Sequence, residues 1–269
     1  MDQQILEDAK TIQAVFFDVD HTFYDHGANK VFAKTIEACQ KMQAKGIKVF
    51  LCSGRPYQEA KDIHLFDYMD YDGYIGCSGG IAYDAKQNVI YEHLFTDEQL
   101  KEIFAVAKAH DLTLLTFGQH QWINKEVDEE VERVLHTFHL VWPKVHEWNH
   151  EKIDAMACMA TNDDVFEYFK HIEGLSYTRS NDAYIDFKRV GTGKAEAIKT
   201  IMANYGLEAG AFIAFGDSMN DIDMIKDARI GIAMQNATQK LKEAADLLCG
   251  PCYEEASIFN ILKELGIID

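Results

Sequence analysis

Short apolar runs alternate with amphipathic segments along the first part of the chain. The runs Ala14–Phe17, 47–52 and 74–77 are bounded by polar residues, which is typical of strands buried on both faces of a sheet. Between the first two runs, apolar residues recur every three or four positions over 32–44, and this spacing predicts a helix. Strand, helix and strand in this order indicate a parallel sheet with helical crossovers.

A different pattern begins after Gly79-Gly80. Two apolar segments between 81 and 91 flank a polar stretch, as the strands of a hairpin do. Thr96 and Gln99 have the spacing of a capping box and predict the beginning of a helix. Further strand and helix patterns follow, among them a helix expected over 125–139.

The order of these patterns predicts two domains, one inserted into the other. From residue 188 onward, buried strands such as 212–215 and amphipathic helices return. We therefore expect an α/β core with a parallel sheet, formed by residues 1–82 and 186–269. An α+β domain formed by residues 83–185 is expected to be inserted into this core.

The charge of the chain narrows the classes of partner. Its 269 residues include 44 acidic and 26 basic side chains, and the formal net charge of −18 argues against a nucleic-acid-binding surface. No apolar run approaches the roughly 20 residues that a membrane-spanning helix needs. The chain starts with acids where a signal peptide is basic. We expect a cytoplasmic protein without membrane contact, whose six cysteines are reduced.

Polar residues cluster where the predicted buried strands end. In an open parallel sheet, ligands bind at the carboxyl ends of the strands. The residues at these ends, and at the start of one helix, are Asp18, Asp20, Thr22, Ser53, Gly54, Lys194, Asp217, Asn220 and Asp221. Four carboxylates converging on one point would repel one another strongly, so the acids predict a divalent cation such as Mg²⁺.

The other polar residues at these strand ends suit an anion. The hydroxyls of Thr22 and Ser53, the ammonium of Lys194 and the backbone amides of the turns form a cradle for phosphate. An aspartate beside the phosphorus can attack it and form an acyl phosphate. An acid two positions further along lies on the same side, where it can protonate the leaving oxygen and later activate water. The predicted substrate is a small phosphorylated metabolite.

These motifs resemble those of the haloacid dehalogenase-like (HAD) superfamily of phosphatases. Asp18-Val19-Asp20-His21-Thr22 matches the first motif, Asp-x-Asp-x-Thr, and Ser53, Lys194 and the stretch 216–221 match the later motifs in order. The stretch 214–224 is similar to the Cof-type subfamily, which has a large cap domain. The resemblance implies a Rossmann-like core with an inserted cap that selects the substrate. It also implies Mg²⁺-dependent hydrolysis of small phosphate monoesters, such as sugar, cofactor or nucleotide phosphates, through an aspartyl phosphate.

The resemblance implies a role for each acid. Asp18 is expected to be the nucleophile and a metal ligand. Asp20 is expected to be the general acid and base, with its backbone carbonyl on the metal. Asp217 is expected to bind the metal, and Asp221 to support the metal site.

The resemblance also implies a set of phosphate-binding residues. Thr22, Ser53 and Asn220 are expected to bind the transferring phosphoryl group. Lys194 is expected to bind it as well and to neutralise the charge that develops in the transition state. Gly54 is expected to allow close approach of the backbone.

Two positions depart from the family pattern. His21 stands where the first motif usually has glycine, and it either adds a contact near the site or is simply tolerated by the turn. Ser78-Gly79-Gly80 stands where Cof-type proteins usually have Asn-Gly-Ala, which affects how the leaving group is oriented. Neither departure removes a catalytic atom.

Other functions remain open at this point. A phosphomannomutase-like phosphotransferase shares the core and the position of the cap. A phosphorelay receiver uses a similar aspartate with Mg²⁺, but it lacks the second acid and is much shorter. Cys249-Gly250-Pro251-Cys252 has the spelling of a thioredoxin redox motif, although it lies in a predicted turn near the end of the chain.

Overall fold

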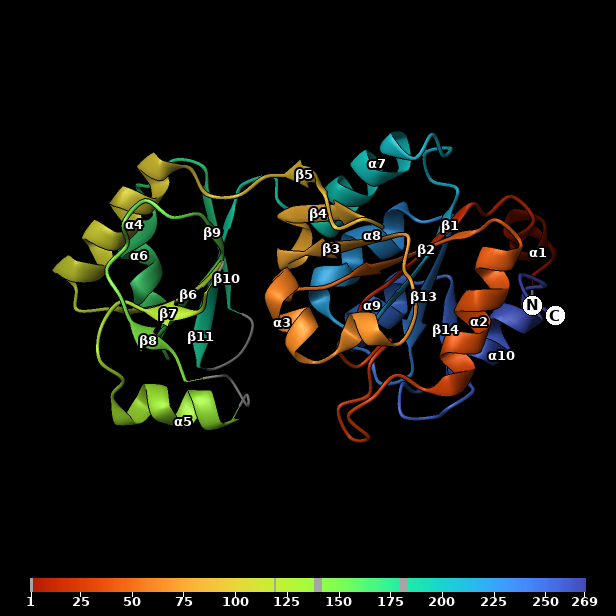
Figure 1. Cartoon of the computed structure of the whole chain (residues 1–269), viewed down its shortest axis with the longest axis horizontal. Coiled ribbons are helices and arrows are strands. Elements are labelled where there is room, and N and C mark those ends of the chain that lie inside the picture. Colours follow the sequence, from red (N-terminus) through yellow and green to blue (C-terminus); the bar gives the residue numbers. More distant parts are fainter. Residues whose placement is uncertain (1, 119, 138–141, 180–182) are drawn as a thin grey trace. The chain divides into compact units, whose positions relative to one another are not determined.

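The computed structural model of the protein describes residues 2–118, 120–137, 142–179 and 183–269. The chain divides into two compact units (Figure 1), of which the first comprises Met1–Glu92 and Gly193–Asp269 and the second His93–Thr192. Within the described ranges, none of the helices has the combination of length and apolar composition that a bilayer crossing needs.

The first unit contains an eight-stranded sheet in the order β14-β13-β12-β1-β2-β3-β4-β5. In that order the strands are Leu247–Cys249, Ile230–Met234, Phe212–Gly216, Ala14–Phe17, Lys48–Cys52, Gly73–Gly76, Ile81–Asp84 and Val89–Glu92. The strands from β14 to β3 are parallel, and β4 and β5 are antiparallel. From β1 the chain builds β2 and β3 on one side and β12 to β14 on the other. The carboxyl end of β1 is therefore a switch point of the kind where ligands bind.

Helices cover both faces of this sheet. They are α1 Gln3–Ala9, α2 Ala33–Ala44, α3 Tyr57–Asp62, α7 Lys194–Asn204, α8 Ile222–Asp227, α9 Gln239–Ala244 and α10 Ser257–Glu264. Val15 and Phe17 of β1 pack in the apolar layer with α2 and α10, whereas Ala14 and Phe16 pack in the layer with α7 and α8. Because both faces are buried, the strand reads as one uninterrupted apolar run. The expected α/β core with a parallel sheet is confirmed.

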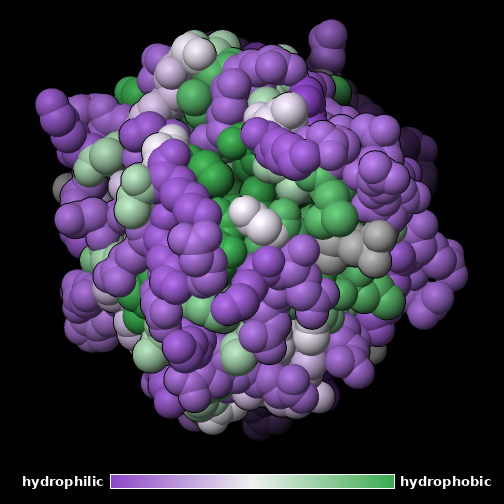
Figure 2. Space-filling view, turned by 90° about the vertical axis from the view of Figure 1, so that its right-hand side faces the viewer, coloured by the Kyte–Doolittle hydropathy of each residue, from purple (hydrophilic) through white to green (hydrophobic). Residues whose placement is uncertain are grey.

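One face of this unit is mostly polar. Figure 2 shows the face on which α1 and α10 lie, where hydrophilic residues surround a smaller apolar area.

The second unit is an α+β domain, as expected. Its six-stranded sheet has the order β10-β11-β9-β6-β7-β8, with β10 Leu175–Arg179, β11 Tyr184–Arg189, β9 Ile153–Met159, β6 Thr113–Gly118, β7 Trp122–Ile123 and β8 Lys144–Val145. Helices α4 Asp97–Ala109 and α6 Phe166–Phe169 pack on one face, and α5 Glu129–Thr137 packs on the other. Thr96 and Gln99 form the predicted capping box at the beginning of α4. The helix expected over 125–139 begins later, at Glu129, and its expected end lies outside the described residues.

The boundaries expected at residues 83 and 185 fall inside β4 and β11. Strand β4 pairs with β3, so the β4–β5 hairpin extends the sheet of the first unit. Strand β11 pairs with β9 and β10 in the second sheet. The two units therefore meet between residues 92 and 93 and between 192 and 193. A hairpin pattern in the sequence does not show which sheet the hairpin joins.

Candidate active site

Three predicted metal ligands come together at the carboxyl ends of β1 and β12. Asp18 directly follows β1, Asp217 directly follows β12, and Asp221 ends a short 3₁₀ turn, Met219–Asp221. One carboxylate oxygen from each lies within 4.8 Å of the others. Asp18 and Asp221 are buried, and Asp217 is partly exposed. The short apolar strands that precede them bring these acids to one edge of the sheet.

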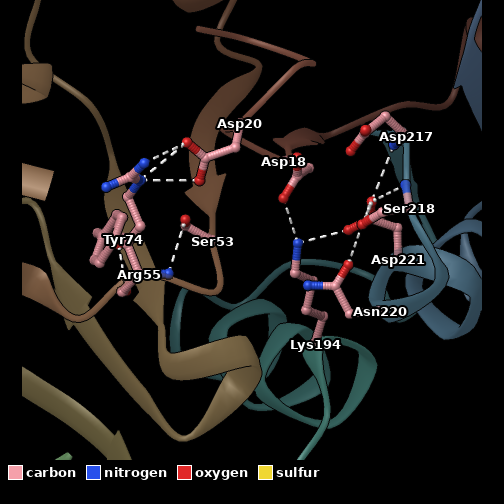
Figure 3. A network of polar contacts seen from close by, with 10 residues as sticks. All are labelled: Asp18, Asp20, Ser53, Arg55, Tyr74, Lys194, Asp217, Ser218, Asn220 and Asp221. Atoms are coloured by element: carbon pink, nitrogen blue, oxygen red, sulfur yellow. Dashed lines mark hydrogen bonds and ion pairs between the residues drawn. The ribbon is translucent and has the colours of Figure 1, made fainter. Parts of the chain in front are cut away.

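Lys194 lies among these acids (Figure 3). Its Nζ is 2.5 Å from Oδ1 of Asp18 and 2.5 Å from Oδ1 of Asp221, and its side chain is completely buried. Lys194 is the first residue of α7, and the loop at Gly79 packs against this end of the helix. Gly79 has a φ of +99°, and a Cβ there would lie 2.2 Å from the carbonyl oxygen of Gly193. Only glycine allows this loop to approach the helix that presents Lys194.

The cluster has more negative charge than Lys194 can balance. Burial, together with the charge of Asp221, raises the pKa of Asp18 well above its ordinary value, although Lys194 opposes this shift. Burial and the charge of Asp221 also raise the pKa of Asp217 to about 7. Carboxylate oxygens are the preferred ligands of hard divalent cations, and a dication would relieve the repulsion that raises these pKa values. The donor set therefore fits a hard divalent metal held by Asp18 and Asp217.

Asp221 also has a structural role in the turn after β12. Its Oδ2 accepts hydrogen bonds from the backbone amides of Asp217 and Ser218, each at 3.0 Å. Gly216 makes room for it, because a Cβ at that position would lie 2.6 Å from the Cβ of Asp221. Asp221 therefore fixes the turn that presents Asp217, and its supporting role at a metal site stays a prediction.

The Asp20 carboxylate is directed away from the other three acids, toward Arg55 (Figure 3). Arg55 Nε lies 2.9 Å from both carboxylate oxygens, and His26 Nε2 lies 2.7 Å from Oδ1. Burial alone would raise the pKa of Asp20, but the hydrogen bond from His26 and the charge of Arg55 outweigh burial and lower it. The side chain of Asp20 thus does not join the acid cluster, and only its backbone carbonyl is left for the expected metal contact.

The sequence interpretation assigned no role to either partner of Asp20. Arg55 carries a detectable signal, since it follows Ser53-Gly54 at the end of a buried strand. His26 carries none, because it lies in a polar loop six positions after Asp20 and only the folded loop brings the two together.

The expected phosphate-binding hydroxyls are buried near the ends of β1 and β2. Thr22 is 1% exposed, and its Oγ1 has no hydrogen-bond partner among the described residues. A buried hydroxyl without a partner is costly, so this atom suits a ligand oxygen. Ser53 is fully buried, and its Oγ accepts a hydrogen bond of 3.0 Å from the backbone amide of Arg55. Its hydroxyl proton is not used in this bond.

Gly54 lies between two other loops of the site. A Cβ at Gly54 would lie 3.4 Å from Oγ of Ser78 and 3.8 Å from Nδ2 of Asn220. Both distances are ordinary van der Waals contacts, so these neighbours do not by themselves require glycine, and the close backbone approach expected of Gly54 stays a prediction. Asn220 accepts a hydrogen bond from the hydroxyl of Ser218 through its Oδ1, which leaves its amide group on the side of Gly54.

Hydrogen bonds through Asn236 link the loop at His21 to the CGPC stretch. His21 has a left-handed backbone conformation, with φ +61°, which explains why glycine is usual at this position. Its carbonyl oxygen accepts a hydrogen bond from Asn236, and the amide of Cys252 donates to the same asparagine. The CGPC turn therefore braces the loop that follows β1.

The two CGPC thiols lack the features of a redox pair. Cys249 and Cys252 are buried and free, and burial raises the pKa of Cys249 to about 12 and that of Cys252 to about 11. Cys249 ends β14, and the following helix α10 begins only at Ser257. A reactive CxxC needs a lowered thiol pKa, usually at a helix N-terminus. The geometry favours a structural turn.

Comparison with known proteins places this site in a family. The chain belongs to the haloacid dehalogenase-like hydrolases, whose family pattern matches residues 15–262. The 5-amino-6-(5-phospho-D-ribitylamino)uracil phosphatase YcsE of Bacillus subtilis is 24% identical, over 88% of this chain and 89% of its own. Relatives named as phosphatases and the family match together identify the protein as a phosphatase.

Solved structures agree with this assignment. BT1666 from Bacteroides thetaiotaomicron, described among the phosphatases of the HAD superfamily, has a TM-score of 0.87 and 25% identity, with 96% of each chain covered. The subclass IIB sugar phosphatase BT4131 has a TM-score of 0.79 and 26% identity, with 95% of this chain and 100% of the other covered. The expected superfamily and fold are thereby confirmed.

Proposed function

We propose that the protein hydrolyses small phosphate monoesters in a Mg²⁺-dependent reaction through an aspartyl phosphate on Asp18. The observation that carries this proposal is the convergence of Asp18, Asp217 and Asp221 around the buried ammonium of Lys194. The unpartnered hydroxyl of Thr22 supports it, because a phosphoryl oxygen would supply the missing hydrogen-bond acceptor.

The metal site would be formed by Asp18 and Asp217, with Asp221 behind them and the backbone carbonyl of Asp20 as a further ligand. A bound Mg²⁺ supplies positive charge that offsets the negative charge of the phosphoryl group and keeps Asp18 ionised. Side chains of the protein perform every other part of the reaction.

The reaction has two halves. An oxygen of Asp18 attacks phosphorus as the bond to the leaving oxygen breaks, and the proton for that oxygen comes from Asp20. Water then attacks the phosphorus of the aspartyl phosphate, Asp20 takes its proton, and Asp18 is regenerated with release of inorganic phosphate. Lys194 balances the charge of the transferring group, and Thr22 and Asn220 donate hydrogen bonds to its oxygens.

Asp20 needs opposite protonation states in the two halves. With Arg55 and His26 bound to it, Asp20 is a carboxylate, which is the form that accepts a proton from water. To protonate a leaving group it must take up a proton and turn one oxygen from Arg55 toward that group.

Sugar phosphates are the first substrate class that we propose, and cofactor or nucleotide phosphates the second. Similarity to the sugar phosphatase BT4131 supports the first, and similarity to the ribitylaminouracil phosphatase supports the second. The six free cysteines suit the reducing cytoplasm as the place of action.

The direct test is phosphate release from a panel of metabolite phosphates, with Mg²⁺ and with EDTA. We expect release that requires Mg²⁺ and leaves the dephosphorylated alcohol. Full activity in EDTA would contradict the metal assignment. An isomerised sugar phosphate without free phosphate would instead support the phosphomannomutase-like alternative, and a long-lived phosphoprotein would support a receiver.

We propose that the second unit, His93–Thr192, is the cap that selects the leaving group. Joining Glu92 to Gly193 through a short Gly/Ser linker removes it. We expect a first unit that folds, as circular dichroism and thermal unfolding report, and that no longer discriminates among the panel substrates. An unchanged substrate profile would show that this unit does not select the substrate.

A further inference from the structure

The Asp20 carboxylate is held by two residues, Arg55 and His26. Arg55, at the end of β2, contacts both oxygens through Nε and contacts Oδ1 again through a terminal nitrogen at 2.9 Å. His26, from the same loop as Asp20, contacts Oδ1 through Nε2 at 2.7 Å. We propose that His26 is a positioning residue that, together with Arg55, sets the orientation of Asp20 for its two proton transfers. This inference rests on the proposed phosphatase function.

The contacts of Arg55 explain why Arg55 alone does not set the orientation of Asp20. Arg55 is itself anchored: its amide donates to Ser53 Oγ, its carbonyl accepts a 2.7 Å hydrogen bond from the Tyr74 hydroxyl, and Glu59 lies 3.7 Å from its guanidinium. Without His26, the Asp20 side chain keeps only the contact with Arg55, and one of the two contacts that set its orientation is lost. Proton transfer tolerates little displacement, because donor and acceptor must come within hydrogen-bond distance.

His26 is also held in place by its own loop. Residues 25 and 30 exchange two backbone hydrogen bonds, and the Asp25 carboxylate accepts a 2.7 Å hydrogen bond from the amide of Ala28. The His26 ring lies against His21 and Tyr24, with ring centroids 4.8 and 5.2 Å away. These contacts fix the ring before any substrate binds, as a positioning role requires.

A second histidine in the same unit provides a matched control. His64 Nδ1 lies 2.9 Å from Asp67, but both side chains are about three-quarters exposed, at 78% and 74%, whereas His26 and Asp20 are 34% and 31% exposed. His64→Ala therefore removes a histidine–aspartate pair with a similar nitrogen–oxygen distance that has no contact with the proposed site.

The test separates the two half-reactions with p-nitrophenyl phosphate. Nitrophenolate leaves without protonation, so a rapid-quench measurement of the first turnover reports attack by Asp18, while the steady state also needs Asp20 to activate water. We expect His26→Ala to leave the first-turnover rate near that of the wild type and to lower the steady-state rate about tenfold. With phenyl phosphate, whose leaving group needs a proton, the first turnover should fall as well. His26→Gln, which can still donate a hydrogen bond, should recover part of the loss.

A double-mutant comparison shows whether His26 acts through Asp20. In an Asp20→Asn background, His26→Ala should cause no further loss of rate, because the positioned group is already gone. In the metal-free protein, Asp20→Asn should shift the ¹⁵N resonance of His26 Nε2 and leave that of His64 unchanged. If His26→Ala does not fold while His64→Ala does, the same comparison is made with His26→Asn. The asparagine side chain is too short to reach Asp20.

Three results would overturn the inference while the wild type remains an active phosphatase. They are equal losses in the first turnover and the steady state with p-nitrophenyl phosphate, an additional loss in the Asp20→Asn background, or wild-type rates in His26→Ala. A wild type that releases no phosphate from either ester in Mg²⁺ would instead contradict the proposed function itself.

Discussion

The side-chain nitrogen of Lys194 lies 2.5 Å from Oδ1 of Asp18, although 176 positions separate the two residues in the sequence. The same nitrogen contacts Asp221 at the same distance, and the lysine side chain is wholly buried. Breaking a buried ion pair from one side leaves an uncompensated charge, which costs far more than losing a surface pair.

Lys194→Met should therefore destabilise the metal-free protein by about 3–5 kcal/mol. Mg²⁺ should restore part of this loss, because it supplies positive charge to Asp18 and Asp217. Urea unfolding with and without Mg²⁺ measures both effects. Lys199→Met, which removes an exposed lysine of the same helix paired with Glu196, serves as the control and should change little. Equal losses in the two variants would contradict the assignment of Lys194 to the cluster.

Metal affinity should depend on pH through Asp217. In the metal-free protein, burial and the charge of Asp221 raise the pKa of Asp217 to about 7, so Mg²⁺ must displace a proton from it at lower pH. We expect Mg²⁺ affinity to fall about tenfold per pH unit for each displaced proton below pH 7. Titration calorimetry between pH 5.5 and 8 measures the slope. In Asp217→Asn, the dependence of Mg²⁺ affinity on pH should correspond to about one displaced proton fewer. An unchanged dependence would show that Asp217 does not release the proton.

The raised pKa of Asp217 also predicts how stability varies with pH. A folded-state pKa of about 7, above the unfolded value of about 3.9, means that the folded protein binds more protons between these values. The contribution of Asp217 to stability is therefore full below about pH 3.9 and is lost as pH rises through 7. The gain in thermal unfolding temperature on adding Mg²⁺ should accordingly be larger at pH 8 than at pH 5.5. A gain that is the same at both pH values would contradict this linkage.

Asp18 and Asp20 should differ in their dependence on the leaving group. Asp18→Asn removes the nucleophile and should abolish turnover of every substrate. Asp20→Asn removes proton transfer, which is usually worth about 10²–10⁴-fold, yet a nitrophenyl ester should still give a burst of nitrophenol. An alkyl phosphate should give no burst. If mass spectrometry finds the phosphoryl group on a residue other than Asp18, the assignment of Asp18 as the nucleophile is wrong.

Gly79→Ala should damage the site through the backbone. A left-handed conformation costs a side-chain-bearing residue about 1–3 kcal/mol, and here the new Cβ would also collide with the carbonyl of Gly193. Gly206→Ala is the matched control, because Gly206 also has a positive φ, +67°, but a Cβ added there would meet nothing within 4 Å. We expect both variants to be less stable and only Gly79→Ala to lose phosphatase activity. Equal activity in the two would show that Lys194 does not depend on this approach.

Cys249→Ser with Cys252→Ser should leave phosphatase activity within about a factor of two. The backbone amide of Cys252 is unchanged, and a serine hydroxyl can replace the thiol that contacts Oδ1 of Asp25 at 4.0 Å. Phosphate release with and without dithiothreitol, and an assay of thiol–disulfide exchange, test this. Exchange activity that disappears in the double variant would establish the redox alternative.

Local patterns in the sequence were sufficient to predict the core and to predict which acids lie together at one edge of the sheet. The apolar runs of β1, β2 and β12 are continuous because helices bury both faces of the sheet, so burial is visible in single segments. The polar residues that follow these runs lie at one edge of the sheet because parallel strands end together. In contrast, β7 and β8 have only two residues each and give too little pattern to be predicted.

Only the tertiary structure decided which partners these residues have. The sequence correctly predicted Asp18, Asp217 and Asp221 as neighbours, but not that Asp20 faces Arg55 and His26. It predicted the β4–β5 hairpin, but not that the hairpin extends the first sheet rather than the second. The physical reason is the same in both cases: periodicity reports whether an element is buried, whereas pairing between distant residues depends on how whole strands, helices and loops pack against one another.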